Sequence, residues 1–268
     1  MSSQMPEPPW RRPHKTRAPK QRKPLSRDTI VAKALEILDA EGIEGVSMRR
    51  IAAELGTGPA SLYAYVADKD ELLAAVNELA LSELAMPNLD QPWQDVVREW
   101  AQSTYDLFRR HRDLARLSFA DIPTGARALD ISEAILRSLI EGGVEVQDAA
   151  WLIDRMVLYV GADAVEGYLL QERFGATDAA AAEVAGRQWI ADVKEYFAAL
   201  PPDRYPMITS HLAPMMSGGG DARFEFGMEL LIAGIEARNP GSATKRTAKK
   251  RADVPRAKPV KKAAKKSK

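Results

Sequence analysis

The 268-residue sequence contains no cysteine and only three histidines, and these absences exclude several kinds of site. Without cysteine the chain can form no disulfide bond, no thiolate nucleophile and no cysteine-ligated zinc site. The histidines, His14, His111 and His211, are scattered and show no metal-ligand spacing. We therefore expect no metal and no other cofactor.

Long apolar runs and a nucleotide-binding loop are also lacking. No apolar run approaches the roughly 20 residues that cross a bilayer, and the N-terminus carries charges and prolines where a signal peptide has an apolar segment. The glycine run at 218–220 lacks the lysine and the preceding strand of a P-loop. No nucleophile, base and acid form a recognisable set. The sequence indicates a cytoplasmic protein that is not an enzyme and does not bind a membrane.

The net charge of +1 hides a strong separation of charge along the chain. Residues 1–24 contain seven Lys or Arg and one acidic residue, and residues 239–268 contain twelve and one. Residues 25–238 contain 19 basic and 35 acidic residues, a balance of −16. Both tails are poor in large apolar residues, so we expect them to be disordered. Such basic tails either bind phosphate or only keep a protein soluble.

The stretch 47–65, SMRRIAAELGTGPASLYAY, predicts two short helices joined by a glycine-containing turn. Ser47 suits the N-cap of the first helix, where Ile51 and Leu55 share an apolar face. Pro59 suits the first position of the second helix, whose Leu62 turns inward. This pattern is a helix-turn-helix. Its second half leaves a set of residues pointing outward as DNA readers: Ala60, Ser61, Tyr63 and Tyr65.

Helical periodicity continues through the rest of the chain and predicts an all-α fold. A first helix is expected between Ser26 and Gly42. Further helices are expected at 68–84, 93–111, 128–139, 148–174, 178–200 and 221–238, with a short piece around 114–117. Polar Thr104 lies on the apolar stripe of the 93–111 helix. The 148–174 helix is apolar nearly all round, so we expect it to be buried on more than one side.

Residues 26–80 resemble the DNA-binding domain of the TetR family of bacterial one-component transcription regulators, and are closest to its tetracycline-repressor branch. The most specific segments are ALEILDAEGIEGVSMRRIAAELG, SLYAYV and DKDELL. The resemblance implies a homodimeric repressor that binds a pseudo-palindromic operator and is released by a small-molecule effector. It implies a DNA-binding domain at 25–84 and an effector-binding and dimerisation domain at 85–238, between disordered tails at 1–24 and 239–268.

The family pattern also implies DNA contacts for individual residues. Phosphate contacts are implied for Ser47, Arg49, Tyr63, Tyr65 and Lys69, and a base edge stays open as a second contact for Ser47 and Arg49. Ala60 would meet a thymine methyl group, and Ser61 would hydrogen-bond a base. The chain departs from the branch at Ala64, where a large aromatic residue is expected. Arg50 fits an intramolecular or solvated charge better than a DNA reader, and a partly buried core position is the alternative for Tyr63.

Residues 25–80 contain only five Lys or Arg against ten acidic residues. An acidic domain draws little affinity from phosphate neutralisation. We therefore hypothesise that the basic tail 1–24, which enters just before the first helix, follows the duplex and reaches a minor groove.

The effector site is the part that the sequence specifies least. The best candidate is a row of residues four apart on the 148–174 helix, facing two aromatics of the 93–111 helix: Trp151, Arg155, Tyr159 and Asp163, with Trp100 and Tyr105 opposite. A core or interface position is the alternative for each, and a structural Arg155–Asp163 pair is another. The fourth helix ends in ALSELAM and lacks the histidine of a magnesium–tetracycline pocket, which argues against that drug.

The 221–238 helix has an apolar stripe with two glycines beside it. The resemblance implies that this helix and the 148–174 helix pair with their copies in a dimer interface formed by Phe224, Gly227, Met228, Leu231, Gly234 and Ile235. The alternative is that both helices pack only within one subunit. A second interpretation of the whole chain also stays open, in which it is a nucleoid-associated, architectural DNA-binding protein. The reason is its C-terminal tail, which resembles the tails of histone-like proteins: TKRTAKKRADVPRAKPVKKAAKKSK.

Overall fold

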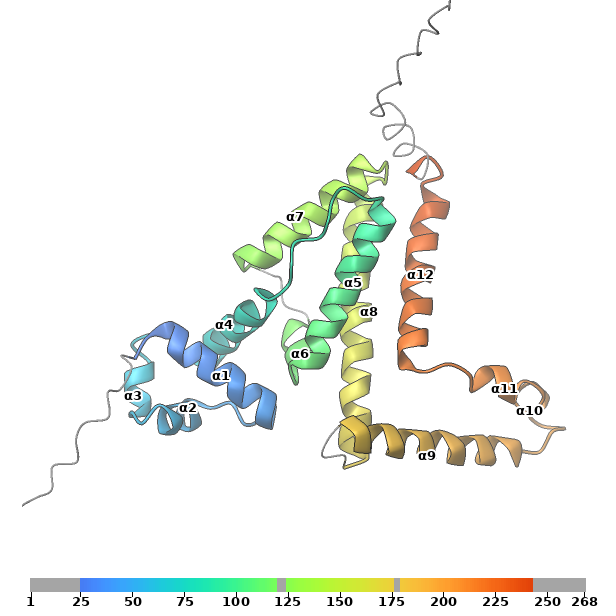
Figure 1. The fold of residues 1–268 in the computed structure, drawn as a ribbon, viewed down its shortest axis with the longest axis horizontal. Helices are drawn as coiled ribbons and strands as arrows, with labels where there is room; N and C mark the ends of the chain where they lie inside the picture. The colour runs from blue at the N-terminus through green and yellow to red at the C-terminus, as the bar shows by residue number, and fades with distance from the viewer. Residues whose placement is uncertain (1–24, 120–123, 176–178, 243–268) are drawn as a thin grey trace, which may run out of the picture.

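The computed structural model describes residues 25–119, 124–175 and 179–242, and all regular secondary structure in these ranges is helical (Figure 1). The helices are α1 (Arg27–Glu41), α2 (Met48–Glu54), α3 (Pro59–Leu62), α4 (Lys69–Leu81), α5 (Trp93–Arg110), α6 (Leu114–Ser118), α7 (Ala126–Glu141), α8 (Val146–Arg173), α9 (Ala179–Ala198), α10 (Pro206–Ser210), α11 (Leu212–Met215) and α12 (Gly220–Arg238). The all-α prediction is confirmed. The predictions for residues 1–24 and for the tail beyond 242 lie outside the described residues.

Helices α1 to α4, here called the head, enclose their own hydrophobic core. Local signals set their ends: the Ser26 hydroxyl accepts a hydrogen bond from the amide of Thr29 at the start of α1, and Gly42 ends that helix at a positive φ of 76°. Asp68 caps α4 by accepting from the amide of Glu71. The side chain of Glu71 reaches the amide of Ala67, one residue before the position expected in a capping box.

Helices α5 to α12 are here called the body, and α5 to α8 together with α12 surround a second and larger core. The long helix α8 lies beside α5, α7 and α12, and Figure 1 shows α5, α8 and α12 side by side along much of their length. Neighbours cover α8 on several sides, but Trp151, Leu158 and Leu169 of this helix are exposed, so the expected burial on more than one side is met only in part.

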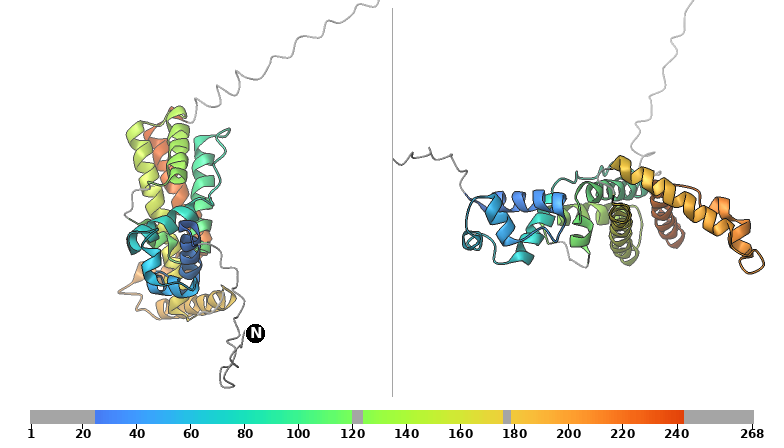
Figure 2. Two further views of the ribbon diagram at one scale, coloured as in Figure 1. Left: turned by 90° about the vertical axis from the view of Figure 1, so that its left-hand side faces the viewer. Right: turned by 90° about the horizontal axis from the view of Figure 1, so that it is seen from below.

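Helices α9 to α11 form an arm at the far end of α8. Helix α9 leaves the end of α8 on the side away from the head, and α10 and α11 fold back against it (Figures 1 and 2). The sequence predicts α9 but neither of the two short helices that follow Pro201 and Pro202. Among the described residues, no helix is long and apolar enough to cross a membrane.

The ordered chain continues past residue 238, where the tail was expected to begin. Asn239 is buried, donates to Asp148 at 2.9 Å, and accepts from the amide of Glu145 at 2.9 Å. Arg238 forms an ion pair with the same Asp148 at 2.9 Å. These contacts fasten the end of α12 to the start of α8, and they hold the pKa of Asp148 below the usual carboxyl range.

Candidate DNA-reading surface and ligand cavity

The helix-turn-helix is held by three buried side chains on α2, α3 and the following turn. Ile51, Leu62 and Val66 are almost completely inaccessible. Ser47 caps α2 by accepting from the amide of Arg50 at 3.2 Å. Gly56 takes a positive φ of 64°, which allows the chain to turn between the helices. The predicted inward residues are therefore confirmed, and the second helix is only one turn long.

The outward face of this motif carries the residues predicted to read DNA. Arg49, Ala60, Ser61 and Tyr65 are exposed, and Tyr63 is 53 % exposed. A core aromatic residue would be much less exposed, so the structure does not support a core position for Tyr63. Lys69 begins α4 beside this face, and its ammonium group lies 3.5 Å from the carbonyl oxygen of Ile43.

Two adjacent arginines on α2 have different surroundings. Arg50 donates to Glu41 at 2.8 Å and also to Glu54, and these hydrogen bonds raise its pKa. It is thus held by the head's own acids, in agreement with the intramolecular interpretation. Arg49 forms no ion pair with any residue that the structure describes, so its guanidinium is available to a ligand.

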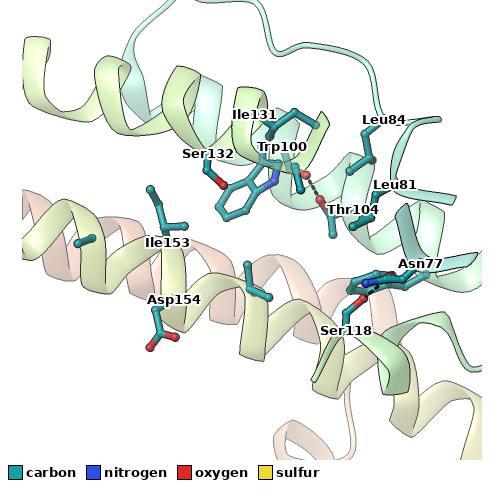
Figure 3. Close-up of a pocket in the computed structure, with 14 residues that line it drawn as sticks. Asn77, Leu81, Leu84, Trp100, Thr104, Ser118, Ile131, Ser132, Ile153 and Asp154 are labelled. Carbon is teal, nitrogen blue, oxygen red and sulfur yellow. Dashed lines mark hydrogen bonds between the residues drawn. The ribbon is translucent and has the colours of Figure 1, made fainter. Parts of the chain in front are cut away.

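A cavity of about 260 Å³ lies where the head meets the body (Figure 3). Its walls come from α4 of the head and from α5, α6, α7 and α8 of the body. Most of the lining is apolar, and the indole of Trp100 projects into the space between Ile131 and Ile153. Because α4 is the last helix of the head, a molecule in this cavity would touch both parts of the protein.

A few polar groups interrupt the apolar lining of this cavity. Ser118 on α6 lies 3.0 Å from Asn77 Oδ1 on α4 and can donate to it, which leaves the Asn77 amide nitrogen as a hydrogen-bond donor. Thr104 donates to the carbonyl of Trp100 at 2.9 Å, so its oxygen can still accept. The hydroxyl of Ser132 forms no hydrogen bond with a described residue and faces the cavity. The cavity can therefore bind an apolar molecule that carries a few oxygen atoms.

The six residues predicted for an effector site do not surround one cavity. Trp100 lines the cavity just described, whereas Tyr105 and Asp163 line a second groove of about 490 Å³ between α8, the arm and the loop before α12. Trp151 is 59 % exposed, and Arg155 is exposed and paired with Asp154 rather than Asp163. A spacing of four residues is longer than one helical turn of 3.6 residues, so successive members of the row point in different directions around α8.

Tyr159 has a structural position next to α12. Its ring is stacked on Phe224 at a centroid distance of 5.6 Å, and Tyr105 is stacked on the same Phe224 at 4.0 Å. The Tyr159 hydroxyl donates to the carbonyl of Phe224 at 2.9 Å. Burial and the nearby Asp163 carboxylate raise the pKa of Tyr159 to about 12. This arrangement joins α5, α8 and α12.

The residues predicted for a dimer interface mostly face the core of their own subunit. Phe224 and Met228 are buried there, and Leu231 and Ile235 pack against the same core. Gly227 lies so close to α8 that an added Cβ would be 2.5 Å from Cζ of Tyr159. Of the six, Gly234 alone has open space around it. Most of this stripe thus packs within one subunit, as in the alternative interpretation, and a second face of α12 also carries large apolar residues.

Sequence reasoning missed four polar residues of the cavity: Asn77, Ser118, Ser132 and Asp154. These residues come from different helices, and no local pattern distinguishes them from solvated polar residues. Thr104 did carry a signal, since it interrupts an apolar stripe.

Comparison with known proteins identifies both parts of the chain. Residues 30–76 match the model of bacterial regulatory proteins of the tetR family, and residues 86–239 match the tetracyclin repressor-like C-terminal domain. The chain is 34 % identical over 221 residues to the HTH-type transcriptional repressor DrrR1 of Streptomyces coeruleorubidus, covering 79 % of this chain and 77 % of DrrR1.

A second relative is the tetracycline repressor protein class A from transposon 1721 of Escherichia coli, 27 % identical over 217 residues, with 80 % of this chain and 92 % of the relative covered. Among solved structures, the TetR family protein ActR of Streptomyces coelicolor in complex with actinorhodin has a TM-score of 0.71 and 37 % identity, covering 81 % of this chain and 97 % of ActR. The fold, the helix-turn-helix and both matches agree, and the chain belongs to the TetR family of bacterial transcriptional regulators.

Proposed function

We propose that this regulator is a homodimeric repressor that binds a pseudo-palindromic operator and is released by a small molecule bound in the 260 Å³ cavity. The observation that carries the proposal is the composition of the cavity wall. Because α4 of the head and α5 to α8 of the body share this wall, a bound molecule changes the free energy of one head orientation relative to another. In a two-fold dimer, such a change alters the spacing of the two reading helices on successive major grooves.

Repression rests on the exposed face of the helix-turn-helix. We expect Ala60 and Ser61, which are exposed, to read bases. The phosphate contacts are expected from Ser47, Arg49, Tyr63, Tyr65 and Lys69. The name of DrrR1, a transcriptional repressor, supports repression rather than activation. The basic tail 1–24 supplies the nonspecific attraction that the acidic head lacks.

A second copy of the chain covers the exposed apolar face formed by α8 and α12. The two helices pack side by side, and large apolar side chains lie outward on both: Trp151 and Leu158 on α8, and Phe226 and Leu230 on α12. Phe226 is 67 % exposed and Leu230 is 57 % exposed. Exposed apolar side chains on two packed helices are suited to form a four-helix interface with the same helices of a second copy.

The dimer is tested by placing a charge on this face. Leu230→Glu should shift the protein from dimer to monomer in sedimentation velocity, because a carboxylate would be buried without a partner. Leu129→Glu is the matched control, since Leu129 is 51 % exposed on α7, outside this face. A dimer that survives Leu230→Glu, or that is lost equally in the control, would contradict this interface.

The effector we infer is a compact, mainly aromatic compound with oxygen substituents. Trp100 and Phe108 offer ring surfaces, and Asn77 and Ser132 offer hydrogen bonds to carbonyl or hydroxyl oxygens. The structure of ActR with actinorhodin supports an effector of this class. The volume of about 260 Å³ is at the lower end of small-molecule sites, so the cavity favours a compound of few rings unless its walls move apart.

The experiment begins with selection of genomic fragments bound by the full chain. A repressor should prefer its operator about a thousandfold or more over random DNA, whereas an architectural protein should show little preference. Hydroxylated aromatic compounds are then screened for release of the selected operator, with Trp100→Ala as the cavity variant. Binding without sequence preference would contradict the proposal that the protein is an operator-specific repressor. Release that is unaffected by Trp100→Ala would place the effector outside this cavity.

A further inference from the structure

The turn between α5 and α6 makes polar contacts with the head at residues far away in the sequence. These contacts involve five residues, called here the head–body joint: Asp39, Ile43, Glu83, His111 and Asp113. His111 is the residue that ends α5, and Asp113 is the residue before α6. Both are nearly buried, although both are polar. Buried polar groups cost free energy unless they are paired, so their partners define their role.

Asp113 fixes the loop that leads into the reading motif. Its Oδ2 accepts a hydrogen bond of 2.9 Å from the backbone amide of Ile43, four residues before Ser47. Its backbone has a positive φ of 57°, an uncommon conformation that aspartate tolerates better than most residues. The neighbouring Gly42 has no side chain at this point, and an added Cβ there would be 2.7 Å from Oδ2 of Asp113. The chain therefore approaches closely enough for a direct hydrogen bond.

His111 joins the body to two helices of the head. Its Nδ1 lies 3.0 Å from a carboxylate oxygen of Asp39, near the end of α1, and its Nε2 lies 3.2 Å from Oε1 of Glu83, just after α4. A carboxylate can only accept a hydrogen bond. A neutral imidazole donates from one nitrogen and presents a lone pair at the other, so only the imidazolium ion satisfies both contacts.

Several other charged groups surround this histidine, and one of them shares the Glu83 carboxylate with it. On α5, Arg110 lies 3.6 Å from Glu83. Arg112 is paired with Glu172 of α8 at 2.9 Å, and Arg116 of α6 is paired with Asp113 at 3.2 Å. Tyr168 of α8 donates to the carbonyl of Arg109, and its pKa is raised to about 12, first by burial and then by Asp39 and Asp113. The surroundings of the joint thus combine four carboxylates with three arginines, and a cation at His111 balances them.

We propose that His111 and Asp113 are positioning residues that set the orientation of the head and carry changes in the cavity to it. Phe108 and Ser118, which line the cavity, stand on either side of this turn, so a movement of α5 or α6 moves the turn. The turn is bonded to the end of α1, to the loop before Ser47 and to the end of α4. This proposal rests on the proposed function, because it assigns the route by which the cavity acts on the head.

The first test measures the orientation of the head within one subunit, without operator or effector. Because the chain has no cysteine, spin labels can be placed at Ala53→Cys on α2 and Leu129→Cys on α7 in the full chain, diluted with unlabelled protein. Pulsed electron–electron double resonance then gives the distribution of distances between the label on the head and the label on the body. In the parent chain this distribution should be narrow at pH 6.

Variants of the histidine separate a charge effect from a loss of structure. At pH 6, His111→Gln should give a broader distribution than the parent chain, because it removes the cation between the two carboxylates. His111→Lys, a permanent cation, should keep the distribution narrow. His211→Gln is the matched control, because this exposed histidine lies in the arm, and it should behave like the parent chain. Identical distributions for the parent chain and His111→Gln at pH 6 would overturn the role of His111.

Variants of Asp113 test the hydrogen bond to the loop. Asp113→Gly allows the positive φ but removes the acceptor, whereas Asp113→Asn keeps both. Hydrogen exchange at the amide of Ile43 should accelerate by roughly three- to tenfold in the glycine variant and stay near the parent rate in the asparagine variant. Equal rates in the two variants would overturn the role of Asp113. Because neither readout uses DNA or effector, a negative result here is distinguishable from failure of the proposed function.

Discussion

Arg49 and Arg50 provide a sharp test of the reading surface, because they are adjacent and differ only in their partners. Arg50 is held by Glu41 and Glu54, whereas Arg49 forms no ion pair with a described residue. Replacing either one by alanine removes one positive charge from the same helix. The long-range electrostatic effect on DNA binding is therefore the same for both, and any difference between the variants reports direct contact.

The expected magnitude follows from one phosphate contact per subunit. A hydrogen bond to a charged group contributes about 1.5–3 kcal/mol, and each 1.4 kcal/mol corresponds to about a tenfold change in affinity. A dimer loses two such contacts, so Arg49→Ala should weaken operator binding at least about a hundredfold. Each lost phosphate contact lowers the slope of log affinity against log salt by about 0.9, so a dimer should lose about 1.8. Arg50→Ala should change affinity only a few-fold and leave the slope close to the parent value.

The assay is fluorescence anisotropy with the selected operator over a series of salt concentrations, with thermal unfolding to show that both variants fold. Equal losses in the two variants would mean that only the charge of the head matters. An unchanged affinity in Arg49→Ala would mean that this residue does not contact DNA.

Three further results are expected. Gly227→Ala should lower the free energy of unfolding by about 1–3 kcal/mol, because the new methyl group overlaps the ring of Tyr159. Gly167→Ala is the control: this glycine has open space around it, so the variant should raise the free energy of unfolding by up to about 1 kcal/mol. Equal effects of the two variants in urea unfolding would contradict the close packing of Gly227 on Tyr159. Asn77→Leu should reduce operator release by aromatic compounds and leave operator affinity intact, and normal release would show that this amide does not bind them. The fold lowers the pKa of Asp148, so this carboxylate stabilises the protein at pH values above the ordinary carboxyl pKa, and the stabilisation is lost as pH falls through the pKa of the folded state. The free energy of unfolding of Asp148→Asn should therefore depend less on pH below about 4 than that of the parent chain. An unchanged pH dependence would show that Asp148 does not stabilise the fold in this way.

Much of the fold could be predicted because its signals are local. Ser26, Ser47 and Asp68 each cap a helix through a hydrogen bond to an amide three residues away. The periodicity of 3.6 residues also separates Leu62, which is buried, from Tyr63, which is exposed. Helix ends and the two faces of the reading motif therefore follow from short stretches of sequence.

The choice between two apolar faces could not be predicted. Helix α12 carries Phe224 and Met228 on one side and Phe226 and Leu230 on another. Hydrophobicity shows that each face avoids water, but it does not say which face packs on the same subunit. Only the position of α8 beside Phe224 decides this, and it leaves the second face exposed.

The sequence by itself determined the helices, the helix-turn-helix and the family, because these depend on the order of residues within a few turns. The tertiary structure alone decided the cavity and the head–body joint. Asn77 meets Ser118 across 41 positions, and His111 meets Asp39 across 72. Such contacts depend on how whole helices pack, and a polar residue carries no mark in the sequence of the distant partner that it will find.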